Sequence, residues 1–235
     1  MLKRIVTSLI GLSLLLAGCV GTSTASQPTS VPPTPAEPTP THIPVDIPPI
    51  QMKAIQALAA DLGSSGADIH VVSSESVDWP DGCLGIAEPG ILCSQIVTPG
   101  FRIMLESGGI QYEYRTNLNG SQVESATKAV TWSRNGGIAG FCDMMTIYLP
   151  SGAFGNSCKG STVSGALTAA ERDQLISWVK TYGSVDLTRS DNATADSMTV
   201  SLDFEGQGTG QPDASVQQQI FDLMGNIYAR IQPQP

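Results

Sequence analysis

Proline placement is the feature that most restricts what this chain can fold into. Nine of the sixteen prolines lie in residues 20–50, where threonine and serine are also frequent. Such a segment cannot bury a core and favours extended, polyproline-like conformations, so we expect a disordered linker over residues 19–49. At roughly 3 Å per residue, this linker reaches up to about 90 Å. Only the chain from residue 50 onward is left to build a folded body.

The first eighteen residues are typical of a secretory signal peptide. Lys3 and Arg4 precede an apolar run over residues 5–16, which is short for a membrane span but suits a signal sequence. The run ends in Leu-Ala-Gly-Cys at positions 16–19, which resembles the bacterial lipobox. The resemblance implies that Cys19 is lipidated, with palmitate among the acyl chains, and becomes the mature N-terminus. An ordinary secretory signal with an incidental cysteine is the alternative.

This signal predicts where the chain resides. A lipid on Cys19 would anchor the mature chain at the extracytoplasmic face of a bacterial cell membrane without a spanning helix. The Pro/Thr-rich linker would then carry the folded part away from the membrane surface. The membrane is therefore one expected partner of this chain.

Charge and histidine content narrow the function classes. The 12 basic and 21 acidic residues give a net charge of −9, which argues against a nucleic-acid partner because such binding depends on clustered cations. The two histidines, His42 and His70, exclude a multi-histidine metal site. His42 lies in the linker, and His70 in an apolar stretch is expected to be packed or hydrogen-bonded. We therefore expect a binding protein with no enzymatic activity and no cofactor.

The hydrophobic pattern beyond residue 50 predicts an α+β fold with antiparallel sheets, divided into two small domains at 50–120 and 121–235. Separated runs of strands and helices favour this class. In the clearest hairpin, Gly108-Gly109 is a two-residue turn that sets Leu105 opposite Tyr112. Helices are expected at 50–62, at 168–182 and after 213, and strands at 69–72, 101–106, 110–115, 129–133, 143–149, 153–158 and 198–205.

Four cysteines remain once Cys19 is assigned to the lipid. Export permits their oxidation, and four cysteines allow three connectivities. We favour Cys83–Cys93 with Cys142–Cys158, because a hairpin about residues 150–151 would place the second pair on opposite strands. A zinc site built from all four thiolates is the alternative, but it normally needs paired close spacings that this sequence lacks.

Three other segments suggest chemistry only superficially. Gly206, Gly208 and Gly210 lie between a strand and a helix but lack the spacing of a phosphate loop, which favours a flexible connection. Asp78-x-x-Asp81-Gly82 has too few ligands for a calcium loop, so a β-turn is expected. Asp203 and Glu205 share one face of a strand, and a solvated face is favoured over a catalytic carboxylate pair.

A glycine-rich segment between two predicted strands is the candidate binding site. A protruding backbone of this kind can enter a cleft and pair like a substrate strand. The alternative is a hairpin turn with no partner. Ile138 is the apolar side chain nearest the centre of the segment, and Phe141 is the next. The candidate residues are Arg134, Asn135, Gly136, Gly137, Ile138, Ala139, Gly140 and Phe141.

Residues 131–141, which read TWSRNGGIAGF, resemble the R-S-G-G-F-A-G opening of emfourin-like proteins. The resemblance continues weakly through the helix at 167–182, the strand near Val200 and the final helix, over residues 128–232. The chain departs from that pattern at Asn135, where the family often has serine, and in carrying Cys142 and Cys158. Emfourin-like proteins inhibit thermolysin-like (protealysin-type) zinc metallopeptidases, so the resemblance implies an exported metallopeptidase as partner.

The stretch 79–115 resembles a second, uncharacterised bacterial envelope domain through Trp79-Pro80-Asp81-Gly82 and the later Pro-Gly-Phe-Arg-Ile at 99–103. That resemblance implies no activity. The sequence as a whole predicts a lipid-anchored extracytoplasmic binding protein that inhibits a metallopeptidase. The alternative is a structural or ligand-binding envelope lipoprotein without inhibitory activity.

Overall fold

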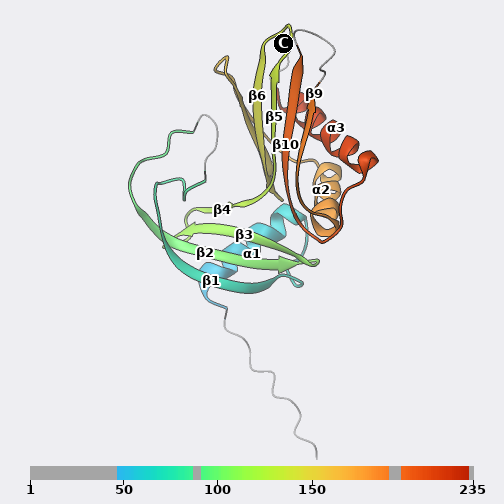
Figure 1. The fold of residues 1–235 in the computed structure, drawn as a ribbon. Coiled ribbons are helices and arrows are strands. Elements are labelled where there is room, and N and C mark those ends of the chain that lie inside the picture. Colours follow the sequence, from blue (N-terminus) through green and yellow to red (C-terminus); the bar gives the residue numbers. More distant parts are fainter. Residues whose placement is uncertain (1–46, 87–90, 191–196, 233–235) are drawn as a thin grey trace, which may run out of the picture. The chain divides into compact units, whose positions relative to one another are not determined.

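The computed structural model describes residues 47–86, 91–190 and 197–232 (Figure 1). Within these residues the predicted α+β class is confirmed, because three helices accompany two antiparallel sheets. The predicted signal peptide, Cys19, His42 and most of the linker lie outside the described residues. No helix among the described residues is long and apolar enough to cross a membrane.

The first sheet has four strands in the order β1-β2-β3-β4 and packs against helix α1 (Figure 1). Leu105 pairs with Tyr112 and Ile103 with Tyr114, which confirms the predicted hairpin register. Alternate residues therefore face α1, which buries Ile55 and Leu58 against them. The elements are α1 (Pro49–Leu62), β1 (His70–Trp79), β2 (Thr98–Ser107), β3 (Ile110–Asn117) and β4 (Val123–Ser125).

The second sheet has six strands in the order β8-β7-β6-β5-β10-β9. Strands β5 and β6 are interior strands, so both edges of each are hydrogen-bonded to neighbours. This interior position matters below, because the candidate site lies where β5 turns into β6. The strands are β5 (Thr127–Gly136), β6 (Phe141–Leu149), β7 (Gly152–Ser157), β8 (Thr162–Ala166), β9 (Gly183–Ser190) and β10 (Met198–Gln207).

Helices α2 (Ala169–Thr181) and α3 (Ala214–Ile231) lie on one face of the second sheet (Figure 1). The predicted capping box begins α2, since the Thr168 side chain accepts from the Glu171 backbone and the Glu171 carboxylate accepts from the Thr168 N–H. Asp213 caps α3 in the same way, by accepting from the backbone of Val216.

Buried side chains from both sheets and all three helices belong to one continuous hydrophobic core. Hydrogen bonds also connect α2 to the elements of the first sheet. Arg172 of α2 donates to the Asp61 carbonyl in α1, and Lys180 of α2 donates to the Gly108 carbonyl in the turn between β2 and β3. The expected boundary near residue 120 falls in the turn between β3 and β4. The division into two domains stays a prediction.

The connection from β10 to α3 is closely packed, which corrects the expectation of a flexible link. A side chain at Gly206 would lie 2.1 Å from the Tyr182 carbonyl oxygen, and one at Gly208 would lie 2.3 Å from the Thr181 backbone. The Gly208 N–H donates to the Tyr182 carbonyl at 2.9 Å. These glycines therefore allow close approach of two backbones.

Candidate functional site at the turn between β5 and β6

The eight predicted site residues form the tip of the β5–β6 hairpin. Arg134, Asn135 and Gly136 end β5, and Phe141 begins β6, so the turn itself is limited to residues 137–140. Gly136 pairs with Phe141 in the sheet. We expected residues 134–141 to protrude as a loop, but this is wrong at both ends of the segment, where the residues are paired within the sheet. Only the short turn at residues 137–140 lies outside the strands.

Backbone contacts hold this turn in one conformation. The Gly140 N–H donates to the Gly137 carbonyl at 2.9 Å, and the Gly137 N–H donates to the Ser197 carbonyl at 3.2 Å. Gly136 has a φ of +89°, and a side chain there would lie 2.5 Å from the Ser197 oxygen. Glycine is therefore required at this position by both conformation and space.

The two apolar candidates at the tip have different environments. The Ile138 side chain is 94% exposed at the end of the turn. Phe141 is half-buried, and the Arg134 guanidinium lies 3.8 Å from the centre of its ring. Ile138 is therefore the apolar group that the tip exposes to solvent, while Phe141 belongs to the base of the hairpin.

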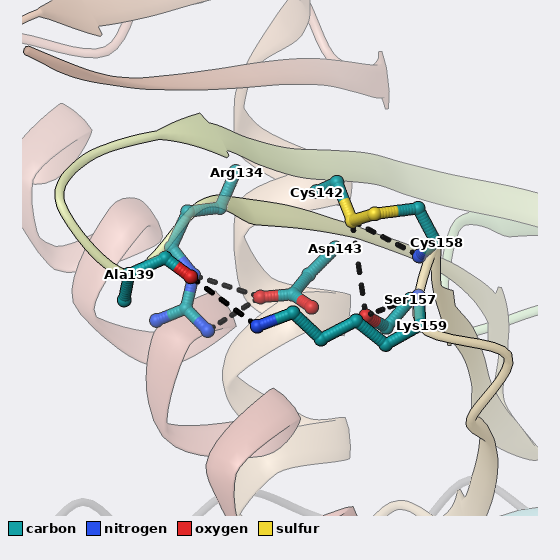
Figure 2. The surroundings of a disulfide bond; sticks show 7 residues. All are labelled: Arg134, Ala139, Cys142, Asp143, Ser157, Cys158 and Lys159. Carbon is teal, nitrogen blue, oxygen red and sulfur yellow. Dashed lines mark hydrogen bonds and ion pairs between the residues drawn. A yellow bond between two sulfur atoms is a disulfide. The ribbon is translucent and has the colours of Figure 1, made fainter. Parts of the chain in front are cut away.

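An ion pair fixes Arg134 (Figure 2). Its Nε and Nη2 atoms donate to one carboxylate oxygen of Asp143 at 3.0 and 2.5 Å. The Asp143 side chain is 9% exposed, so this pair is shielded from water more than an ordinary surface pair. Burial and a hydrogen bond to Asp143 raise the pKa of Tyr228 to about 12, which keeps this phenol neutral beside the pair.

The predicted disulfide Cys142–Cys158 is present directly behind the tip (Figure 2). It joins Cys142 of β6 to Cys158, the residue after β7, with 5.6 Å between the Cα atoms. Lys159, next to this disulfide, donates from Nζ to the Ala139 carbonyl at 3.2 Å. The turn is therefore contacted on one side by Lys159, which the disulfide holds close to β6, and on the other by Ser197.

The second predicted disulfide, Cys83–Cys93, is also present, with 5.4 Å between the Cα atoms. All four cysteines of the described residues are thus in disulfides, with the pairing that the sequence favoured. Asp81 lies beside Cys83 and accepts from the backbone N–H groups of Cys83 and Gly85, which is the behaviour of a turn residue.

The remaining sequence candidates lie away from the tip. Glu205 forms an ion pair with Lys128 at 2.5 Å, and burial raises the pKa of Asp203 on the same strand. His70 was expected to be packed or hydrogen-bonded, and the packed form of that expectation is wrong, because His70 is exposed at the start of β1. Successive side chains of a strand point to opposite faces of the sheet, and His70 lies on a solvent-facing side.

The residues that support the tip were missed by sequence reasoning. Ser197, Lys159 and Tyr228 contact it from the start of β10, the turn after β7 and helix α3. No local pattern signals these roles, because each depends on which strands become neighbours.

Comparison with known protein families matched one part of the chain. Residues 51–125 match a family model described as a domain of unknown function (DUF8738). The matched segment spans nearly all of α1 and the whole first sheet. It ends before the β5–β6 tip. Searches of curated proteins and of solved structures each found no match.

Proposed function

We propose that this chain is a lipid-anchored extracytoplasmic binding protein that inhibits a thermolysin-like metallopeptidase through the β5–β6 turn. The lipobox-like segment ending at Cys19 supports the anchor, and the Pro/Thr-rich stretch after it supports a tether. The observation that carries the inhibitory role is the 94% exposed Ile138 at the end of a braced turn. The resemblance of residues 131–141 to emfourin-like proteins supports the class of target.

The proposed contact is a short, rigid insertion. A metallopeptidase cleft accepts an apolar side chain in a pocket beside its metal, and Ile138 is the apolar side chain that the turn presents. The Cys142–Cys158 disulfide, the Lys159–Ala139 contact and the Gly137–Ser197 contact restrict the turn before binding. Restriction in the free protein lowers the conformational entropy lost when the complex forms.

Occupied backbone groups in β5 and β6 limit how the tip can bind. Asn135 and Gly136 pair with β6 on one side and with Thr199 and Met198 of β10 on the other, so these residues have no free ladder edge to offer a substrate-binding cleft. The proposal therefore assigns the contact to residues 137–140 and to the Ile138 side chain. The longer strand-like insertion expected from the sequence is not part of it.

The test is inhibition of peptide hydrolysis by the full chain purified in a nonionic detergent. Ile138→Glu places a charge where the apolar pocket would receive the side chain, and we expect inhibition to weaken by roughly 100-fold or more. Leu92→Glu is the matched control, because Leu92 is 98% exposed at a distant disulfide loop. This control should inhibit as the wild type does.

The outcomes separate the proposal from its alternative. Equal inhibition by wild type and Ile138→Glu would show that the turn is not the contact surface. No inhibition of several thermolysin-like peptidases at micromolar protein would favour a structural or ligand-binding envelope lipoprotein. Thermal unfolding of both variants should match the wild type, since both side chains are exposed.

A further inference from the structure

A pocket of about 450 Å³ lies between α3 and the ends of β5, β10 and β9, and the proposed inhibitory contact does not use it. Its volume is within the range of small-molecule sites. Trp132, Met198, Val200 and Phe221 supply apolar surface, and Arg134 and Arg189 supply two cations. The combination of apolar walls with few charged groups is what binding sites for small organic ions share.

Strand register brings the two arginines to the same row of the sheet. Val200 of β10 pairs with Arg134 of β5 on one side and with Arg189 of β9 on the other. Side chains directly opposite one another across neighbouring strands lie on the same face. The three strands therefore set a guanidinium on each side of Val200, on the face that α3 covers.

The two arginines differ in how they are paired. Arg134 has Asp143 as its partner, at 2.5 and 3.0 Å. The Arg189 guanidinium lies over Phe221, 3.9 Å from the ring centre, and its nearest carboxylate oxygen, on Asp222, is 4.0 Å away. Asp222 itself accepts two hydrogen bonds from Gln218, at 2.8 and 3.0 Å. Arg189 is thus positioned by an aromatic ring, and its ion pair with Asp222 is long, at 4.0 Å.

Two buried donors in the pocket walls lack an acceptor. Nη2 of Arg189 and Nε1 of Trp132 are both buried and have no hydrogen-bond partner among the described residues. Trp132 is only 3% exposed. Buried donors are rarely left unpaired in folded proteins, because desolvating them without a bond is costly. Both atoms lie beneath the pocket surface and are not exposed to a ligand there.

Gly225 gives the pocket room on its helical side. This glycine lies inside α3, where glycine destabilises a helix relative to alanine. A side chain built at Gly225 would meet no atom within 4 Å, so packing in the described structure does not explain the glycine. Because Gly225 has no side chain, the helix backbone is exposed to the pocket at this position. A ligand could therefore pack directly against it.

From these observations we propose that the pocket binds a monocarboxylate that carries an apolar group. A guanidinium matches the two oxygens of a carboxylate, and Arg189 is 41% exposed at the pocket. Asp222 beside Arg189 leaves too little positive charge for a dianion such as a phosphate monoester. The apolar group packs on Phe221, Val200 and the open helix surface at Gly225. The carboxylate comes either from a free organic acid or from the C-terminus of a peptide with an apolar last residue.

The test is calorimetric titration of the full chain, in a nonionic detergent, with two matched pairs of probes. The first pair is 3-phenylpropionate and its neutral amide, and the second is the peptide Gly-Gly-Phe with a free and with an amidated C-terminus. We expect an acid to bind with a Kd of about 1 mM or tighter, and its amide roughly tenfold more weakly. Binding of the acid alone identifies free organic acids as the source, and tighter binding of the peptide identifies C-termini.

Three variants tie this binding to the pocket. Arg189→Met should raise the Kd of the acid roughly tenfold. Arg102→Met is its control, because Arg102 is also about 40% exposed, lies over a tryptophan ring, and has carboxylate oxygens at 3.5 and 3.9 Å. Gly225→Leu should block binding by filling the pocket while raising the melting temperature, because leucine favours a helix more than glycine does.

The proposal fails if neither acid binds at millimolar concentration, or if acid and amide bind alike. It also fails if Arg102→Met weakens binding as much as Arg189→Met does, or if Gly225→Leu folds normally and still binds. Because Ile138→Glu should leave acid binding unchanged, these outcomes are independent of whether the chain inhibits a peptidase.

Discussion

Replacing Arg134 with methionine tests whether the base of the β5–β6 hairpin depends on its shielded ion pair. The change removes two charge-assisted hydrogen bonds to Asp143 and the contact with the Phe141 ring. Breaking a buried pair by removing one partner costs roughly 3–5 kcal/mol. Because the Arg134 side chain is 28% exposed, we place the loss of unfolding free energy near the lower end, at about 3 kcal/mol.

The assay is denaturant unfolding at neutral pH, with Arg134→Met and Asp143→Asn measured singly and together. The double variant should lose less than the sum of the single changes, by roughly 1–2 kcal/mol, because it no longer buries an unpaired carboxylate. Arg102→Met, whose pairs with Glu75 and Glu113 are longer, at 3.9 and 3.5 Å, and more exposed, should cost less than about 1 kcal/mol. Additive losses from Arg134→Met and Asp143→Asn would refute the claim that this pair is shielded and coupled.

Three further predictions concern the stem, the pH response and the anchor. Replacing Cys142 and Cys158 together with serine should lower the unfolding free energy by about 3 kcal/mol, measured in the same denaturation assay, because the closed loop has a sequence separation of 16. Burial raises the pKa of Tyr112 to about 12. Because the neutral phenol is favoured in the folded state, the free energy of unfolding should be unaffected by this group below pH 10 and should fall by roughly 2–3 kcal/mol as the pH rises toward 12. Tyr112→Phe removes the ionisable group and should flatten that part of the stability–pH curve. Cys19→Ala should release the chain from the membrane fraction or leave its signal unprocessed, and normal anchoring of the variant would contradict lipidation.

Local patterns were enough to predict the hairpins, caps and disulfides. Leu105 opposite Tyr112 follows from a two-glycine turn and period-two alternation, both contained in fifteen consecutive residues. The Cys142–Cys158 pair follows in the same way from the β6–β7 hairpin, whose register sets Met144 opposite Asn156 as expected. Each of these features depends on neighbours in the sequence, where turn chemistry fixes the geometry.

Two edge strands of the second sheet were missed. In β9, Val185 and Leu187 alternate with polar residues, a pattern that indicates a strand. This short pattern directly follows helix α2, which made the strand hard to recognise in the sequence. In β8, Val163 is the single buried side chain, so the pattern is too short to detect. Edge strands bury less apolar surface than central ones, and their hydrophobic signal is correspondingly weak.

The contacts that shape both proposed sites join segments far apart in the sequence. Arg134 and Arg189 share a row only because β10 pairs with both β5 and β9. Ser197 braces the turn only because β10 starts beside the end of β5. Strand order of this kind is set by how the whole sheet packs on its helices, and no single segment encodes it. The sequence could therefore indicate Ile138 and the turn, but not their supports.

Steady-state kinetics of a thermolysin-like metallopeptidase in the presence of the full chain test the proposed function most directly. If the turn with Ile138 occupies the substrate cleft, the apparent KM for a short peptide should rise in proportion to the concentration of the chain, while kcat stays constant. Ile138→Glu should remove this effect. A fall in kcat at unchanged KM, or a rise in KM that persists in Ile138→Glu, would contradict the assignment of the turn as the inhibitory contact.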